Sequence, residues 1–221
     1  MNGRQKAAFV LNVLIFVFTL FATIAMIVGF NFMGDVKVLS SRNFWAFKYF
    51  TVDSNVFAGI ISLVYVILSL TPQGKNEKLS KTMYILKLAA TTGVTLTMMV
   101  TVFFLAPRST TTYFDYFKNS NFFMHFFTPL LCIISFVFFE PVEKPSFVLS
   151  LSGIIPMVLY ACFYVPNILL HLENGKPTHS YDWYGFLDGG LNTAWFVFPL
   201  LVAITWIFSL VLWVLNKKIA R

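Results

Sequence analysis

Charged side chains are scarce in this sequence. Asp, Glu, Lys and Arg together make up 11% of its 221 residues, whereas a soluble domain carries about 25%. The few charges are also clustered, and six stretches contain none of them: 7–34, 54–74, 88–107, 119–139, 145–172 and 189–216. Each stretch reaches the roughly 20 residues that a membrane-spanning helix needs. This scarcity excludes a soluble enzyme, a disordered chain and a disulfide-stabilised scaffold.

The apolar stretches also lack the alternation of polar and apolar residues that marks the strands of an outer-membrane β-barrel. Residues 63–68, for example, form an apolar run without alternation. Within a bilayer such a backbone must satisfy its own hydrogen bonds as helices. We therefore predict an all-α membrane protein, with six transmembrane helices in one bundle and one domain over residues 1–221. The spans are expected at about 8–30, 50–70, 83–105, 122–139, 147–170 and 193–215.

Acidic residues are fewer than basic ones, and the net charge is +7. We do not expect a nucleic-acid partner, because basic residues beside membrane spans commonly set the topology. With six spans, nine Lys and Arg residues fall on the side of the termini and six on the other. This bias predicts that both termini are cytoplasmic. Lys87, inside the third span near its start, is expected to snorkel to the cytoplasmic side.

Cysteine and histidine are rare as well. Cys132 and Cys162 lie inside spans, so a structural disulfide is not expected, and the motifs CxxC and HExxH are absent. We expect no metal site and no cofactor. The first charge-free run is longer than the 7–15 residues, roughly, of a signal-peptide core, and we interpret it as a retained span.

The polar residues that remain gather at one level of the membrane. The second span opens with Thr51, Asp53, Ser54 and Asn55, and the fourth with His125. His171 ends the fifth span, and Asp182 and Asp188 follow in the last outer loop. Polar residues inside spans are costly and often functional. The pattern therefore predicts a site toward the outer leaflet.

Helix geometry refines this prediction. Thr51, Ser54 and Asn55 share a helix face, whereas Asp53 points away from it. Asp53 either has a catalytic role or caps the helix, because an acidic side chain in the first turn interacts favourably with the helix dipole. Pro129 deprives the carbonyl of His125 of its helical partner and predicts a kink beside the imidazole. A hydroxyl and an imidazole suggest acyl transfer, although a lone histidine near the interface is more often without a catalytic role.

Other polar residues carry a weaker signal. The third span contains Thr91, Thr95, Thr97 and Thr101, which we interpret as small packing residues between helices. The GxSxG motif of serine hydrolases is absent, so any hydrolase here is of another type.

Three segments carry a resemblance to a known family. FKYFTVDSN (47–55), MHFFTPLLCIISFVFFE (124–140) and YDWYGFLDGG (181–190) resemble the androgen-induced protein family, which includes the androgen-dependent regulator of tissue factor pathway inhibitor. The resemblance extends from about residue 8 to residue 216, and the third segment is similar mainly to bacterial members. It implies an integral-membrane threonine hydrolase, because animal members cleave fatty acid esters of hydroxy fatty acids. The family nucleophile, in a K-Y-(F/L)-T motif, matches Thr51, and its histidine, in an M-H motif, matches His125.

The resemblance does not extend to the residues VDSN after Thr51, so it assigns no role to them. Our first hypothesis is an intramembrane lipid-ester hydrolase in the bacterial cytoplasmic membrane, with Thr51 as nucleophile and His125 as base and then acid. Asn55 or Ser54 would stabilise the oxyanion. His171, Asp182 or Asp188 would orient His125 or bind the lipid head group. The ester would enter from the outer leaflet.

Two alternatives remain open. A small transporter needs polar residues through the membrane depth, and the inner halves of spans two, four and six are nearly all apolar. A lipid-binding protein without catalysis has the same sequence signature as a hydrolase. The sequence leaves the oligomeric state open.

Overall fold

The structure, a computed structural model, describes residues 1–35, 43–72, 78–108 and 112–220. These residues are largely helical and contain no β-strand. Six helices are long and apolar enough to cross a membrane: Gly3–Val28, Phe50–Ser69, Lys81–Arg108, Ser120–Phe139, Phe147–Leu170 and Leu191–Ile219. The all-helical prediction is thus confirmed, and the described residues contain as many helices of sufficient length and apolarity as the sequence predicted spans. Four loop cations that entered the topology prediction, Lys37, Arg42, Lys75 and Arg221, lie outside the described residues.

Several spans change helix type along their length. The first two are the regular helices α1 (Gly3–Val28) and α2 (Phe50–Ser69). The third is α3 (Lys81–Val100), which continues as a π-helical turn, η3 (Thr101–Leu105). The fourth comprises α4 (Ser120–Phe122), the π-helical η6 (Phe123–Phe127), α5 (Thr128–Ile134) and the π-helical η7 (Ser135–Phe139). The last two are η8 (Phe147–Ile154) with α6 (Ile155–Leu170), and η9 (Leu191–Thr193) with α7 (Ala194–Ile219).

Local sequence signals fix the helix ends. The side chain of Asn2 accepts a hydrogen bond from the amide of Gln5 at 2.9 Å, and the Gln5 side chain accepts one from the Asn2 amide. This reciprocal capping starts α1. Gly29, at φ 70°, ends α1 in the left-handed conformation that glycine adopts without steric cost.

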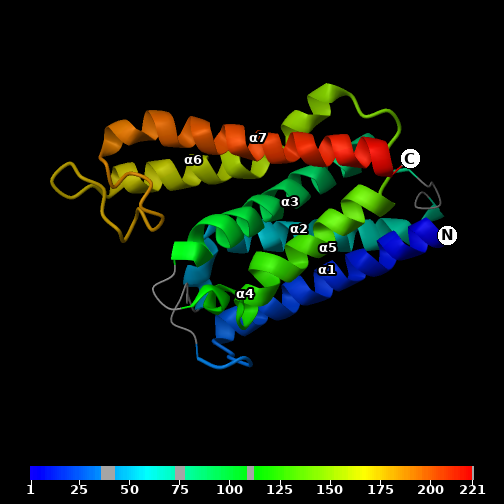
Figure 1. Cartoon of the computed structure of the whole chain (residues 1–221), viewed down its shortest axis with the longest axis horizontal. Helices are drawn as coiled ribbons and strands as arrows, with labels where there is room; N and C mark the ends of the chain where they lie inside the picture. Colours follow the sequence, from blue (N-terminus) through cyan, green and yellow to red (C-terminus); the bar gives the residue numbers. More distant parts are fainter. Residues whose placement is uncertain (36–42, 73–77, 109–111, 221) are drawn as a thin grey trace.

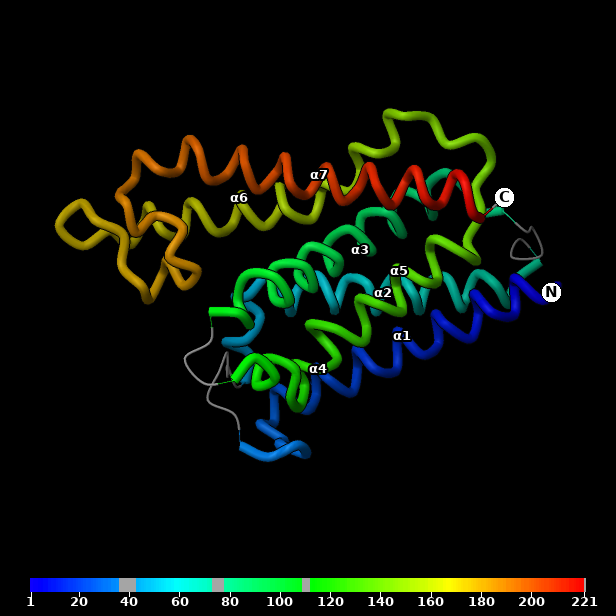
Figure 2. Tube along the Cα trace, viewed as in Figure 1, coloured from blue at the N-terminus to red at the C-terminus, as the bar shows by residue number. Residues whose placement is uncertain are grey.

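The third span lies in the middle of the molecule. Figures 1 and 2 show α3 between the α6–α7 pair and the helices α1, α2 and α5. All residues from Lys87 to Met98 are buried. The small residues of α3 permit this close packing, and a Cβ atom on Gly93 would lie 3.2 Å from the Cβ of Ser54.

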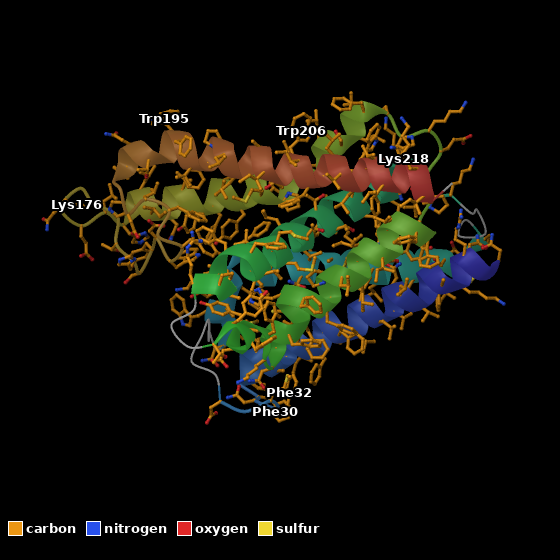
Figure 3. All side chains as sticks on the ribbon, viewed as in Figure 1. Phe30, Phe32, Lys176, Trp195, Trp206 and Lys218 are labelled. Atoms are coloured by element: carbon orange, nitrogen blue, oxygen red, sulfur yellow. The ribbon has the colours of Figure 1, made fainter. Side chains whose placement is uncertain are left out.

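The two chain ends meet at one end of the helices, which we call the terminal end. Arg4 Nη1 donates a hydrogen bond to the carbonyl of Ala220 at 2.9 Å, and Lys218 lies at the same end (Figure 3). The opposite end, which we call the distal end, carries the first turn of α2 and the connection 171–190, where Figure 3 labels Lys176. The six spans thus return the chain to its starting end.

The prediction that Lys87 snorkels is wrong. Lys87 is 2% exposed, and its Nζ lies 3.0 Å from Glu140 Oε1 and 2.7 Å from Asn12 Oδ1. Asn12 Nδ2 and Ser135 Oγ donate to the same Glu140 oxygen at 2.8 Å and 2.6 Å. We call Asn12, Lys87, Ser135 and Glu140 the terminal polar centre. Because the first and fourth spans supply partners inside the protein, the ammonium group has no need to reach water.

Candidate functional site

His125 lies on a widened helical turn at the distal end. The amide of Thr128 donates to the carbonyl of Phe123, five residues earlier, which is the π-helical pattern. Pro129 follows and has no N–H for the carbonyl of His125, so the regular helical ladder is interrupted here. The sequence predicted this interruption, and π-helical turns of this kind are frequent at functional sites.

The imidazole of His125 is held by a threonine. Its Nδ1 lies 2.7 Å from the Oγ1 of Thr101, and the two residues are 3% and 1% exposed. Thr101 starts η3, so this bond joins the π-helical turns of the third and fourth spans. Sequence reasoning had assigned Thr101 to helix packing. Thr101 lies at the same membrane depth as His125, at the distal end of its span, and this depth could have identified it as a partner of His125.

Thr51 and His125 line the same cavity. The cavity has a volume of about 180 Å³ and lies against the first turn of α2, in which Thr51 is half-buried. Its other walls are mainly apolar or aromatic: Met26, Ala46, Tyr49, Val52, Leu105, Met124, Trp183 and Tyr184, with Asn121. The structure therefore brings the two principal candidate residues to one mainly apolar cavity.

Asn55 fixes the backbone around these two residues. Its Nδ2 donates to the carbonyl of Thr51 at 2.8 Å and to the carbonyl of Met124, next to His125, at 2.9 Å. Both amide hydrogens are thereby used, and Asn55 is fully buried. Asn55 thus ties the segment that bears Thr51 to the segment that bears His125, and its N–H groups are not directed into the cavity.

The other two polar residues of the first turn face elsewhere. Ser54 Oγ lies 3.1 Å from the carbonyl of Thr51 and 3.2 Å from Thr97 Oγ1. Asp53 and Ser54 line a second cavity of about 270 Å³ between α2 and α6, whose further walls are apolar or aromatic. Thr51 is not among its lining residues. The sequence predicted that Thr51, Ser54 and Asn55 share one face. In the structure Thr51 lines the cavity of His125, Ser54 lines the second cavity, and Asn55 bonds to backbone carbonyls.

The connection between α6 and η9 covers the cavity of Thr51 and His125. Trp183 and Tyr184 line it, and the Phe50 amide donates to the Tyr184 hydroxyl at 2.9 Å. Trp183 Nε1 donates to the Tyr160 hydroxyl at 3.0 Å. Burial raises the pKa of Tyr184 above its usual value. Trp183 and Tyr184 belong to the segment YDWYGFLDGG (181–190), and the sequence did not predict that they line the cavity.

Asp182 organises this covering loop. It is 1% exposed, and its carboxylate accepts hydrogen bonds from the Tyr164 hydroxyl and from the amides of Phe186 and Leu187. A carboxylate that accepts several amide bonds holds a loop in one conformation. Asp182 therefore positions Trp183 and Tyr184. Among the described residues its carboxylate bonds to Tyr164 and to the covering loop rather than to His125.

His171 and Asp188 lie at the surface of the distal end. The His171 ring stacks on Tyr181 with 3.8 Å between centroids, and its Nδ1 lies 2.7 Å from the carbonyl of Asn167. Asp188 Oδ1 lies 3.8 Å from His179 Nδ1, and both side chains are exposed. The structure thus places Thr101, and neither His171 nor Asp188, beside the His125 ring. In the described ranges no group of three or more His, Cys, Asp or Glu residues could hold a metal ion.

Comparisons of the chain with protein-family models, with curated proteins and with solved structures gave no match. The functional argument therefore depends on the geometry of the site and on the residue motifs.

Proposed function

We propose that the protein is an intramembrane ester hydrolase that uses Thr51 as nucleophile and His125 as general base and then acid. The observation that carries this proposal is the shared cavity, which is lined by Thr51 and by His125, whose imidazole is held by Thr101. Asn55 fixes the backbone of both segments. Such fixed geometry is what nucleophilic catalysis requires.

The hydrogen bond to Thr101 accommodates the tautomer that this chemistry needs, in which Nδ1 carries the proton and the Thr101 hydroxyl oxygen accepts it. When Nδ1–H donates to Thr101 Oγ1, the Nε2 atom is unprotonated and free to act as a base. Nε2 then takes the Thr51 proton as Oγ1 attacks the ester carbonyl. The tetrahedral intermediate collapses, and His125 returns the proton to the leaving alcohol. Water attacks the acyl-threonine with the same base, which releases the fatty acid and restores Thr51.

The first turn of α2 supplies electrostatic support for the intermediate. Thr51 lies at the positive end of the helix dipole. The Phe50 amide donates to the Tyr184 hydroxyl, and the amides of Val52 and Asp53 donate to the carbonyl of Tyr49. The Thr51 amide, rather than the occupied side chains of Ser54 and Asn55, is therefore our candidate for stabilising the oxyanion.

The substrate that fits is a lipid ester. The cavity walls are mainly apolar, and they belong to helices that are long and apolar enough to cross a membrane. We propose lateral entry from the outer leaflet of a bacterial cytoplasmic membrane, with six helices in one bundle and both termini cytoplasmic, as the charge bias predicts. The resemblance to the androgen-induced protein family makes fatty acid esters of hydroxy fatty acids the first substrates to test.

A hydrolysis assay tests this proposal. The wild type, Thr51→Ala and His125→Ala, purified in detergent, would each be offered a panel of lipid esters. Thr95→Val and His171→Ala are matched controls, because Thr95 bonds only to the carbonyl of Thr91 and His171 lies at the surface. We expect turnover by the wild type and both controls, and loss in the two site variants with unchanged thermal unfolding.

Two results would count against the hydrolase. Turnover that survives in Thr51→Ala would move the nucleophile elsewhere, with Ser54 the next candidate. Binding of lipid esters to every variant without turnover in the wild type would support the non-catalytic lipid-binding protein.

A further inference from the structure

A third cavity, larger than the two described above, opens at the terminal end, far along the helices from Thr51. It has a volume of about 640 Å³. Four segments form its walls: the start of α1, the residues before α3, the connection 141–145 and the end of α7. The Leu79 amide donates to the carbonyl of Pro141 at 2.7 Å, which joins two of these segments. The cavity is therefore built by parts of the chain that are distant in sequence.

Positive charge converges on this cavity. Of the described residues that line it, Arg4, Lys78, Lys144 and Lys217 are basic and Glu143 alone is acidic, with its Oε1 3.7 Å from Lys78 Nζ. The positive-inside rule accounts for cations at this end in general, but Lys6, Lys81 and Lys218 are exposed at the same end and do not line the cavity. Like charges around one space repel unless an anion joins them.

The cations are held in place by specific contacts. Arg4 bonds to the carbonyl of Ala220, and Lys217 Nζ lies 4.6 Å from the centre of the Trp213 ring. Lys144 has φ 40°, an uncommon conformation for a residue other than glycine. Asn216, also in the wall, donates to the carbonyls of Phe136 and Glu140 at 2.6 Å and 3.0 Å. The cavity thus has a fixed frame that adjoins the terminal polar centre.

The position of the cavity in the membrane points to a lipid. The spans begin or end at Gly3, Lys81, Phe139, Phe147 and Ile219, so the cavity lies at the level of the head groups. Beside it the exposed side chains are apolar: Phe147 is 54%, Val148 67% and Ile219 41% exposed. An anion bound in the cavity would therefore have a surface for acyl chains next to it, which a free phosphate does not need.

We propose that this cavity binds the phosphate group of an anionic phospholipid, independently of the hydrolase proposal. Lys78 and Lys144 supply point charges to the phosphate oxygens, and Arg4 and Lys217 add positive charge beside them. Each such charge contributes on the scale known for basic residues at anionic membranes. A lipid with a net negative head group is preferred over a zwitterionic one, because the second charge of a zwitterion would meet the same cations.

Lipid binding to the purified protein tests the site. Native mass spectrometry in detergent would follow titration with phosphatidylglycerol and, separately, with phosphatidylcholine. The double variant Lys78→Gln/Lys144→Gln should bind phosphatidylglycerol roughly 30-fold more weakly than the wild type. The matched control Lys6→Gln/Lys218→Gln removes the same charge from the same end without touching the cavity, and its binding should change much less. All four lysines are exposed, so the fold is not expected to change.

A variant of the opposite sign sharpens the test. Glu143→Gln removes the acidic side chain found among the described residues of the cavity wall and should tighten phosphatidylglycerol binding by roughly fivefold. Equal losses in the two double variants would overturn the site in favour of diffuse attraction to the whole surface. Equal binding of phosphatidylcholine, or displacement of the lipid by millimolar inorganic phosphate, would also overturn the assignment to an anionic lipid.

Discussion

Two buried polar groups lie at opposite ends of the helices and differ in how they are completed. In the terminal polar centre, Lys87 and Glu140 carry opposite charges 3.0 Å apart, with Asn12 and Ser135 on the same carboxylate oxygen. At the distal end, His125 meets a neutral threonine, and the same histidine lines a cavity with Thr51. Both groups are almost fully buried.

The difference leads us to propose different roles for two groups of buried polar residues. The terminal polar centre has its polar atoms directed at one another, apart from Glu140 Oε2, which has no partner among the described residues. Such an arrangement ties three helices together. The distal group instead has Thr51 and His125 beside open volume. We therefore interpret the first group as structural and propose a chemical role for the second.

The largest effect is expected from Thr51→Ala. Loss of a nucleophile typically lowers turnover by about 10⁴-fold or more, while the free energy of unfolding should change by less than about 0.5 kcal/mol, because Thr51 is half-buried and its carbonyl bonds remain. Ester hydrolysis and chemical unfolding of the same preparation provide the two readouts. A large loss of stability would mean that Thr51 has a structural role, and the distinction between the distal group and the terminal polar centre would no longer hold.

Lys87→Met should show the reverse pattern. Removing one partner of a buried pair leaves the Glu140 charge uncompensated and costs about 3–5 kcal/mol of stability. The double variant Lys87→Met/Glu140→Gln should recover much of that loss, and the exposed Lys81→Met is the control. Unfolding titrations in detergent measure all three. A double variant as unstable as Lys87→Met would mean that the pair is not coupled.

Much of the fold could be predicted because charge-free runs report directly on membrane spans. The partner of Lys87 could not be predicted, since Glu140 follows a π-helical turn that sets its direction and Asn12 comes from another span. Thr101 was missed for the same reason: its contact with His125 depends on two π-helical turns. Ideal helix geometry grouped Thr51 with Ser54 on one face. It could not show that neighbouring helices give the two side chains different surroundings.

A moderate effect is expected from Thr101→Val. Loss of the hydroxyl removes the bond that orients the imidazole, and misplacement on this scale lowers turnover by about 10²-fold. The maximal rate should fall with little change in the substrate concentration for half-saturation. Thr101→Ser keeps the hydroxyl and should recover most of the rate. If Val and Ser variants behave alike, Thr101 acts only through packing.

The smallest effect is expected from Asp53→Asn. Asp53 lines the second cavity rather than that of Thr51, so turnover should stay within about threefold of the wild type. The hydrolysis assay measures this directly. A loss comparable to that of Thr101→Val would show that the second cavity belongs to the reaction and that Asp53 is part of the catalytic group.

The most direct measurement is the site of covalent labelling by an ester-hydrolase probe. The wild type and His125→Ala would be treated with a fluorophosphonate, digested and mapped by mass spectrometry. We predict one adduct, on Thr51, which is strongly reduced in His125→Ala, because the imidazole activates the hydroxyl. An adduct on Ser54, or hydrolysis that continues with Thr51 unmodified, would contradict the assignment of the distal cavity as the catalytic site.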